Sequence, residues 1–321
     1  MVNCEHLEFP SATGQGTVKA CLYWPEIAAL RPESILLQIG HGMAEHKQRY
    51  EAFCRHMAGI GYAVCIHDQA GHGLTAPSDE NLGYFGEADG CTKLCQDIDT
   101  LAELAVQRLE IATADERKWR RVFIGHSMGA FIGQLYCTNS GQPLAGAIFS
   151  GTAGSNPAVR LGLFLANRSV RVNGSVYKDE FLAALTWNGF LNKIPGARTK
   201  LDWLSRDAAV VDAYIADPKC GFTFTAAGYR DLYTCLIAIS QKDWAAKVPA
   251  SLPVFLISGG ADPVGNYGKG PHQVHARLRA TGHQAELKIF PDGRHEMLNE
   301  TNKAEAWQAI ADWLNLVYNS Q

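Results

Sequence analysis

Apolar residues along the chain occur in two alternating patterns. Short, largely apolar runs are typical of strands buried in a sheet, and apolar residues three or four positions apart are typical of helices. Strands are predicted at residues 17–24, 34–40, 62–67, 121–125, 144–150, 252–258 and 285–290. Helices are predicted at about residues 48–59, 90–111, 128–139, 271–280 and 303–318. This alternation predicts an α/β fold, in which helices cover both faces of a mostly parallel sheet.

The alternation is interrupted between residue 151 and about residue 248. This stretch shows short helical pieces broken by Gly and Pro, and no clear strand. Because strands and helices resume at residue 252, we expect an insertion after one strand and not a second folding unit in series. The prediction is one α/β core, made of residues 1–150 and 249–321, with a mainly helical insertion at residues 151–248.

Composition and charge exclude several classes of protein. Hydrophobic residues make up 47 % of the chain and charged residues 19 %, which is typical of a globular protein. The 29 basic residues are balanced by 32 acidic ones, for a formal charge of −3, so we expect no nucleic-acid partner. The apolar runs are shorter than the 18 or so residues that a membrane span requires. The number of subunits is left open.

The N-terminal residues and the cysteines bear on the compartment. No charged leader followed by an apolar stretch is visible, so we expect no signal peptide. The nine cysteines are odd in number and irregularly spaced, which predicts reduced thiols in a cytoplasmic protein. Cys91 and Cys95 lie one helical turn apart and could share a metal ion. No second Cys/His pair with zinc-site spacing accompanies them, so we interpret both as buried helix residues and expect no metal.

The pentapeptide Gly125-His126-Ser127-Met128-Gly129 is the first feature that indicates chemistry. A predicted strand leads into it and a predicted helix leaves it, which is the setting of a nucleophile elbow. Such a turn is so tight that only small residues, here Gly125 and Gly129, fit on either side of the serine. The hydroxyl of Ser127 is then expected to project above the edge of the sheet.

A serine nucleophile needs a histidine base that a carboxylate orients. On this type of fold the acid and then the histidine follow later strands of the sheet. Asp262 lies in the loop after the strand at 252–258, and His295 lies in the loop after the strand at 285–290. We therefore predict Ser127, Asp262 and His295 as a catalytic triad.

Other residues compete for two of these roles. Asp292 is the rival acid, but it lies only three residues from His295 in the same loop. His283 precedes the last strand, and His272 and His275 fall on a predicted helix, so none of these three is expected to act as the base.

Two backbone amides should stabilise the oxyanion that forms during acyl transfer. One is the amide of Met128, the residue after the serine. The other should come from the loop after the strand at 34–40, where Gly42 allows the backbone to turn. We predict the amide of Met43 as this second donor.

The sequence resembles the α/β-hydrolases of the monoacylglycerol lipase and bacterial lysophospholipase type, which are grouped with the serine aminopeptidase-like hydrolases. Three separated blocks carry the resemblance: His41-Gly-Met-Ala-Glu-His46 with Arg49-Tyr50, Asp68-Gln-Ala-Gly71-His72-Gly73, and the elbow. The resemblance extends over nearly the whole chain except much of residues 151–248. It implies hydrolysis of esters with one acyl chain and a mobile cap between two strands. It also implies the triad and oxyanion donors given above.

The resemblance gives meaning to further residues. His41, Glu45, Arg49 and His72 match family positions that we interpret as shaping loops. Bulky apolar residues of the cap could line an acyl channel or simply hold the cap on the sheet, and the two interpretations are compatible: Leu161, Leu163, Phe164, Leu165, Phe181, Leu182, Leu185, Trp187, Phe190 and Leu191. The family also includes a cap that meets membranes, and basic residues of this cap would suit transient contact with anionic lipid: Arg160, Arg168, Arg171 and Lys178.

We therefore expect a serine esterase acting on a monoacylglycerol or lysophospholipid through an acyl-serine intermediate, without a cofactor. A peptidase or amidase is the alternative, because the same triad serves both reactions. A peptidase would need acidic cap residues to hold a free α-amino group, and these leave it open: Glu180, Asp202, Asp207, Asp212 and Asp217. A non-catalytic receptor is a further alternative, but such proteins usually lack a triad member and none is missing here.

Overall fold

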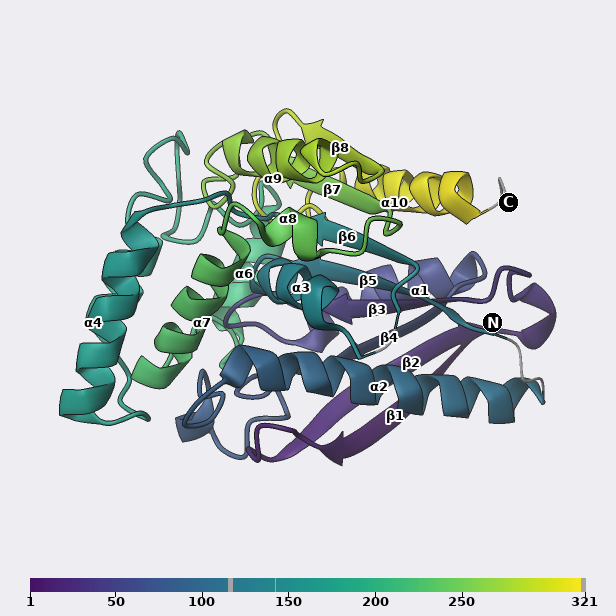
Figure 1. Cartoon of the computed structure of the whole chain (residues 1–321), viewed down its shortest axis with the longest axis horizontal. Helices are drawn as coiled ribbons and strands as arrows, with labels where there is room; N and C mark the ends of the chain where they lie inside the picture. Colours follow the sequence, from purple (N-terminus) through teal and green to yellow (C-terminus); the bar gives the residue numbers. More distant parts are fainter. Residues whose placement is uncertain (115–117, 142, 319–321) are drawn as a thin grey trace.

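A single eight-stranded sheet forms the centre of the computed structural model, which describes residues 1–114, 118–141 and 143–318 (Figure 1). The strands lie in the order β1-β2-β4-β3-β5-β6-β7-β8. Their bounds are β1 Val2–Pro10, β2 Thr17–Pro25, β3 Ile35–Gly40, β4 Ala63–His67, β5 Arg120–His126, β6 Gly146–Ser150, β7 Val254–Gly259 and β8 Ala285–Phe290. β1 and β2 run antiparallel to their neighbours, and the other six strands are parallel. The predicted α/β fold with a mostly parallel sheet is confirmed.

Two layers of helices cover the sheet, because the central strands bury side chains on both faces. In β5, Val122 and Ile124 pack toward α1 (Glu51–Gly59) and α10 (Lys303–Tyr318). Phe123, between them, points to the opposite face, which α2 (Gly90–Thr113), α3 (Met128–Asn139) and α9 (Lys269–Ala280) cover. Short 3-10 helices in the described part of the chain lie at Ile27–Ala29, Lys47–Tyr50 and Asp79–Asn81.

The chain between β6 and β7 is helical. We call residues 151–248 the inserted segment. Its helices are α4 Ala158–Asn173, α5 Glu180–Trp187, α6 Ala208–Ala216, α7 Ala226–Ile239 and α8 Trp244–Lys247. It contains no strand, only an isolated bridge between Lys178 and Thr225. Figure 1 shows α4 and α7 side by side at the end of the molecule away from α10.

The carboxyl ends of the parallel strands meet at one edge of the sheet. The loops that follow β3, β5, β6, β7 and β8 therefore converge there. Met43, Ser127, Asp262 and His295 lie in these loops, and Gly125, Met128 and Gly129 lie in the adjoining ends of β5 and α3. Within the described residues, no helix is long and apolar enough to cross a membrane. All nine cysteines are free thiols.

Candidate active site

Ser127 occupies a strained turn between β5 and α3. Its φ of 51° and ψ of −117° lie in a region that side-chain-bearing residues rarely adopt. The turn closes tightly, because a Cβ on Gly125 would lie 2.3 Å from the carbonyl oxygen of Gly129. A Cβ on Gly129 would lie 2.1 Å from the carbonyl oxygen of Gly40. The geometry is that of the nucleophile elbow which the sequence pattern predicts.

The structure joins His295 and Asp262 directly. The Nδ1–H of His295 donates to Oδ1 of Asp262 at 3.0 Å, and the same oxygen accepts from the amide of Val264 at 2.9 Å. Both side chains are buried. Burial of the imidazole opposes its charged form, but the adjacent Asp262 carboxylate outweighs this, and the pKa of His295 is raised above its ordinary value. This carboxylate therefore also fixes the tautomer that leaves Nε2 free to accept a proton.

Ser127 and His295 line one cavity. Their neighbours bring them together, since the ring of His126 lies 4.7 Å from that of His295. The Ser127 amide donates to the carbonyl of Ser150, and a Cβ on the next residue, Gly151, would lie 3.0 Å from Cε1 of His295. Loops from three strands thus place the hydroxyl and the imidazole at one edge of the sheet.

The two predicted oxyanion donors lie at the same place. Met43 and Met128 both line the cavity, and a Cβ on Gly42 would lie 3.3 Å from that of Ser127. Across residues 1–114, 118–141 and 143–318, no hydrogen bond is found from the amide of Met43 or of Met128 to a protein acceptor. Both N–H groups are thus available to an oxygen on the substrate.

Glu45 and Arg49 hold the loop that carries Met43. The Glu45 carboxylate accepts from the amide of Gly42, from the Tyr50 hydroxyl at 2.6 Å, and from the Arg49 guanidinium. Arg49 in turn binds both carboxylate oxygens of Glu296, at 2.8 and 2.6 Å. Sequence reasoning did not single out Glu296, because the link joins residues far apart in the chain.

His41 and His72 also act on loop shape. His41 donates from Nδ1 to the carbonyl of Gly42 at 2.8 Å and accepts at Nε2 from the amide of Gln69 at 3.0 Å. His72 stacks on Phe85 and bonds the carbonyl of Ala70. Burial lowers the pKa of both histidines, so both are neutral. Their contacts are with the loops and not with the cavity, which fits the loop-shaping interpretation.

The inserted segment holds the histidine loop in place, a role that the sequence did not indicate. The amide of His295 donates to the carbonyl of Trp203 at 3.3 Å, and the next amide donates to the carbonyl of Leu204 at 2.8 Å. The indole of Trp203 lies 5.1 Å from the imidazole of His295. The preceding residue, Arg294, donates to the carbonyls of Asp202 and Ser205.

The rival residues lie elsewhere. Asp292 is exposed and makes no hydrogen bond to His295 in the structure. His283 bonds the carbonyl of Val248, and His272 and His275 on α9 are outside the cavity that holds Ser127. Among the buried cysteines, the Cys91 thiol bonds the carbonyl of Asp231, and Cys95 packs in the same apolar core.

The cavity above Ser127 has a volume of about 810 Å³. Its floor comes from the α/β core and most of its apolar wall from the inserted segment, including Val159, Leu161, Leu185, Trp187, Phe190, Trp203, Leu232 and Leu236. Of the apolar residues considered as channel lining, Leu161, Leu185, Trp187 and Phe190 do line it. Phe164 and Phe181 instead point to solvent, and Leu182 is buried in the core.

Comparison with known proteins agrees with this geometry. The family described as serine aminopeptidase, S33, matches residues 32–302. The monoacylglycerol lipase of Mycolicibacterium smegmatis is 25 % identical over 282 residues, which are 86 % of this chain and 86 % of that protein. Human monoglyceride lipase is 25 % identical over 283 residues, 87 % of this chain and 80 % of the relative.

Solved structures show the same relationship. A thermostable carboxyl esterase from Bacillus coagulans, in complex with glycerol, superimposes with a TM-score of 0.89 at 29 % identity, over 98 % of this chain and 99 % of that one. These matches confirm the resemblance found in the sequence. The chain belongs to the serine aminopeptidase S33 family of α/β-hydrolases.

Proposed function

We propose that this serine hydrolase cleaves carboxylic esters that carry one acyl chain, with Ser127 as the nucleophile. The observation that carries the proposal is the position of Ser127, in a strained elbow at the floor of an apolar cavity of about 810 Å³, beside the His295–Asp262 pair. A cavity of this size suits one fatty acyl chain.

The chemistry follows from the arrangement of donors and acceptors. His295 accepts the Ser127 proton as the hydroxyl attacks the ester carbonyl, and Asp262 stabilises the imidazolium that forms. The amides of Met43 and Met128 donate to the oxyanion. His295 then returns the proton to the leaving alcohol, and a water molecule that it activates releases the fatty acid from the serine.

The preferred substrate is a monoacylglycerol or a lysophospholipid. The apolar wall supports the acyl chain, and the names of the Mycolicibacterium and human relatives support a monoacylglycerol. Residues 151–248 would then serve as a cap over the serine, because they supply most of that wall.

An amidase or aminopeptidase of the same fold is less well supported. Of the acidic residues that could have held an α-amino group, none lines the cavity in the described residues. The acidic residues that do line it, Glu45 and Glu296, are both paired with Arg49. All three predicted triad residues are present, which argues against the interpretation as a receptor without activity.

The outer surface of the inserted segment supports transient contact with a membrane. Large apolar side chains that do not line the cavity are exposed on α4, α5 and the turn between them: Phe164, Val172, Val176, Tyr177 and Phe181. Arg160, Arg168 and Arg171 are exposed on α4. Lys178 is directed elsewhere, because its ammonium donates to the carbonyl of Leu82. The free thiols support a reducing, cytoplasmic setting.

A substrate panel tests the proposal. Monoacylglycerols, lysophospholipids and aminoacyl amides of graded chain length would be compared by kcat/KM, with Ser127→Ala as the blank. We expect Ser127-dependent turnover of the single-chain esters. Their kcat/KM should rise as the acyl chain lengthens and fills the apolar part of the cavity. A preference for aminoacyl amides would overturn the ester assignment.

A further inference from the structure

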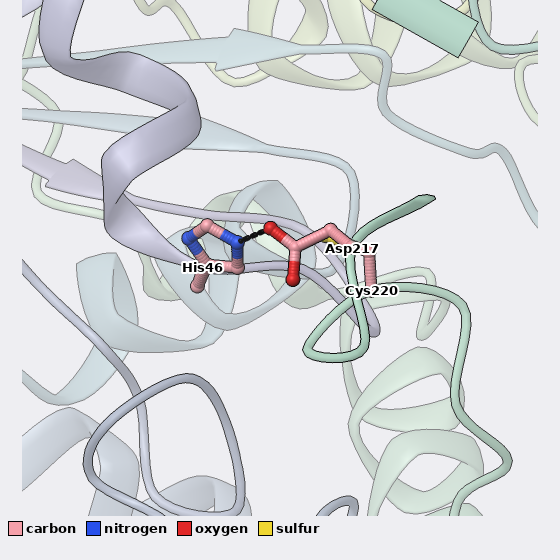
Figure 2. Close-up of side chains that lie close together, drawn as sticks. All are labelled: His46, Asp217 and Cys220. Atoms are coloured by element: carbon pink, nitrogen blue, oxygen red, sulfur yellow. Dashed lines mark hydrogen bonds and ion pairs between the residues drawn. The ribbon is translucent and has the colours of Figure 1, made fainter. Parts of the chain in front are cut away.

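Three metal-ligating side chains meet outside the catalytic cavity. His46 ends the loop that carries Met43, and Asp217 and Cys220 lie in the turn after α6 (Figure 2). One nitrogen, one carboxylate oxygen and one sulfur of these residues all lie within 4.8 Å of one another. His46 is buried, whereas Asp217 and Cys220 are partly exposed, so the cluster opens to solvent.

The turn that carries two of the ligands is rigid. Oδ1 of Asp217 accepts the amide of Lys219 at 2.8 Å, and the amide of Cys220 donates to the Asp217 carbonyl at 3.0 Å. The turn is also fixed to the loop after β3, because the Gly221 amide and the Tyr214 hydroxyl both donate to the carbonyl of Ala44, at 2.9 and 2.7 Å. The turn is thus already ordered before an ion binds, so binding costs little conformational entropy.

His46 is oriented as a metal-binding histidine should be. Its Nδ1 lies 2.7 Å from Oε1 of Gln48, an oxygen that can hold the proton on Nδ1. With a proton held on Nδ1, loss of the proton that Nε2 shares with Asp217 leaves a lone pair on Nε2 for an ion, and an outer partner of this kind is typical of histidine ligands. Nε2 lies 2.7 Å from Oδ2 of Asp217 (Figure 2). These two atoms would separate to about 3.3 Å around a tetrahedral zinc ion, a movement of about half an ångström.

The electrostatic surroundings allow a cation. Asp217 brings an acidic side chain to the cluster, where it pairs with His46. The nearby Arg49 is paired with the carboxylates of Glu45 and Glu296.

We propose that His46 Nε2, an oxygen of Asp217 and the sulfur of Cys220 form a binding site for a zinc-class divalent ion, with solvent as the fourth ligand. A nitrogen, oxygen and thiolate set favours Zn²⁺ or Co²⁺ over Mg²⁺ or Ca²⁺, which prefer oxygen ligands alone. Binding releases two protons to solvent, that of the Cys220 thiol and the one shared by His46 Nε2 and Asp217, and their hydrogen bond is replaced by two bonds to the ion. The sequence alone predicted no metal, because residues 46 and 217 are far apart in the chain.

Cobalt titration of the purified, metal-free full chain tests the site. A thiolate–cobalt bond gives a charge-transfer band in the near ultraviolet, so we expect a saturable band at one equivalent that Zn²⁺ abolishes. The band should be lost in Cys220→Ser, and zinc affinity should fall about tenfold or more in Cys220→Ser and in Asp217→Asn. Cys4→Ser and His272→Gln change a thiol and an imidazole elsewhere, and both should keep the band.

Thermal melting gives an independent readout. Because an ion that binds only the folded chain stabilises it, Zn²⁺ should raise the Tm of the wild type and of the two controls, and not that of Cys220→Ser or Asp217→Asn. Far-ultraviolet circular dichroism establishes that each variant is folded. A wild-type titration without a thiolate band, or a band that persists in folded Cys220→Ser, would overturn the proposal.

Discussion

Arg49 and Glu296 form a bidentate ion pair. Nη1 of Arg49 lies 2.8 Å from Oε1 of Glu296, and Nη2 lies 2.6 Å from Oε2. Because Arg49 also binds Glu45, this pair connects the loop that carries the Met43 amide to the loop that carries His295. The charged side chains thus fix the position of the predicted oxyanion donor relative to that of the predicted base.

The first prediction concerns this pair. Glu296→Gln keeps the shape of the side chain but leaves a largely buried Arg49 with half of its compensating charge. We expect a loss of about 3 kcal/mol or more in the free energy of unfolding, measured by urea denaturation. We also expect kcat to fall about tenfold or more, because the ion pair that connects the Met43 loop to the His295 loop is weakened.

The matched control is Glu51→Gln. Glu51 pairs with Arg55 on the surface of α1, where both side chains are nearly half exposed. Such pairs contribute little, so stability and kcat should stay near wild type. Equal effects of the two substitutions would show that the Arg49–Glu296 pair has no special role.

The pH profile should report the ionisation of His295. Its pKa is raised because the Asp262 carboxylate outweighs the effect of burial. The protonated imidazole cannot accept the Ser127 proton, so kcat/KM should fall about tenfold per pH unit below that pKa and level off above it. The inflection should lie above 6.5, the ordinary histidine value. An inflection below 6.5 would mean that burial dominates and that Asp262 does not act as described.

The elbow should not tolerate a single added methyl group. In Gly129→Ala, the new Cβ would lie 2.1 Å from a backbone oxygen that cannot move without shifting β3. We expect a loss of about 1–3 kcal/mol in stability together with loss of ester turnover. In Gly59→Ala no atom lies within 4 Å of the new Cβ, and stability should be equal or higher. Retained turnover in Gly129→Ala would contradict the tight elbow.

Acyl-chain preference should depend on the wall of the cavity. Leu236 lines the cavity from α7, and Leu236→Trp adds bulk there. We expect kcat/KM to drop for long-chain esters more than for short-chain esters, measured as the ratio of the two. Ile111→Trp adds similar bulk on an exposed position of α2, and should leave the ratio unchanged. An unchanged ratio in Leu236→Trp would place the acyl chain elsewhere.

The sequence alone predicts the central strands and the candidate triad, for physical reasons. Strands such as β5 are buried on both faces, and their central residues, here Val122, Phe123 and Ile124, are therefore apolar. The elbow is a local motif that lies between a strand and a helix. β1 is not predicted, because at the edge of the sheet it buries only the side chains of Leu7 and Phe9.

The links that hold the site together are not predicted. Arg49 and Glu296 are 247 positions apart, and His46 and Asp217 are 171 apart. No local pattern marks such pairs, because only the meeting of loops at one edge of the sheet makes them neighbours. The same is true of Trp203, whose carbonyl and ring position His295 from the inserted segment.

The role of Ser127 as the nucleophile is tested most directly by peptide mass spectrometry after incubation with a fluorophosphonate. We predict a single adduct on Ser127, with ester turnover lost in proportion to labelling, and neither label nor turnover in Ser127→Ala. Ser78→Ala, at an exposed serine, should label as the wild type does. Full ester turnover by Ser127→Ala, or an adduct on another residue that accounts for the lost activity, would contradict the mechanism.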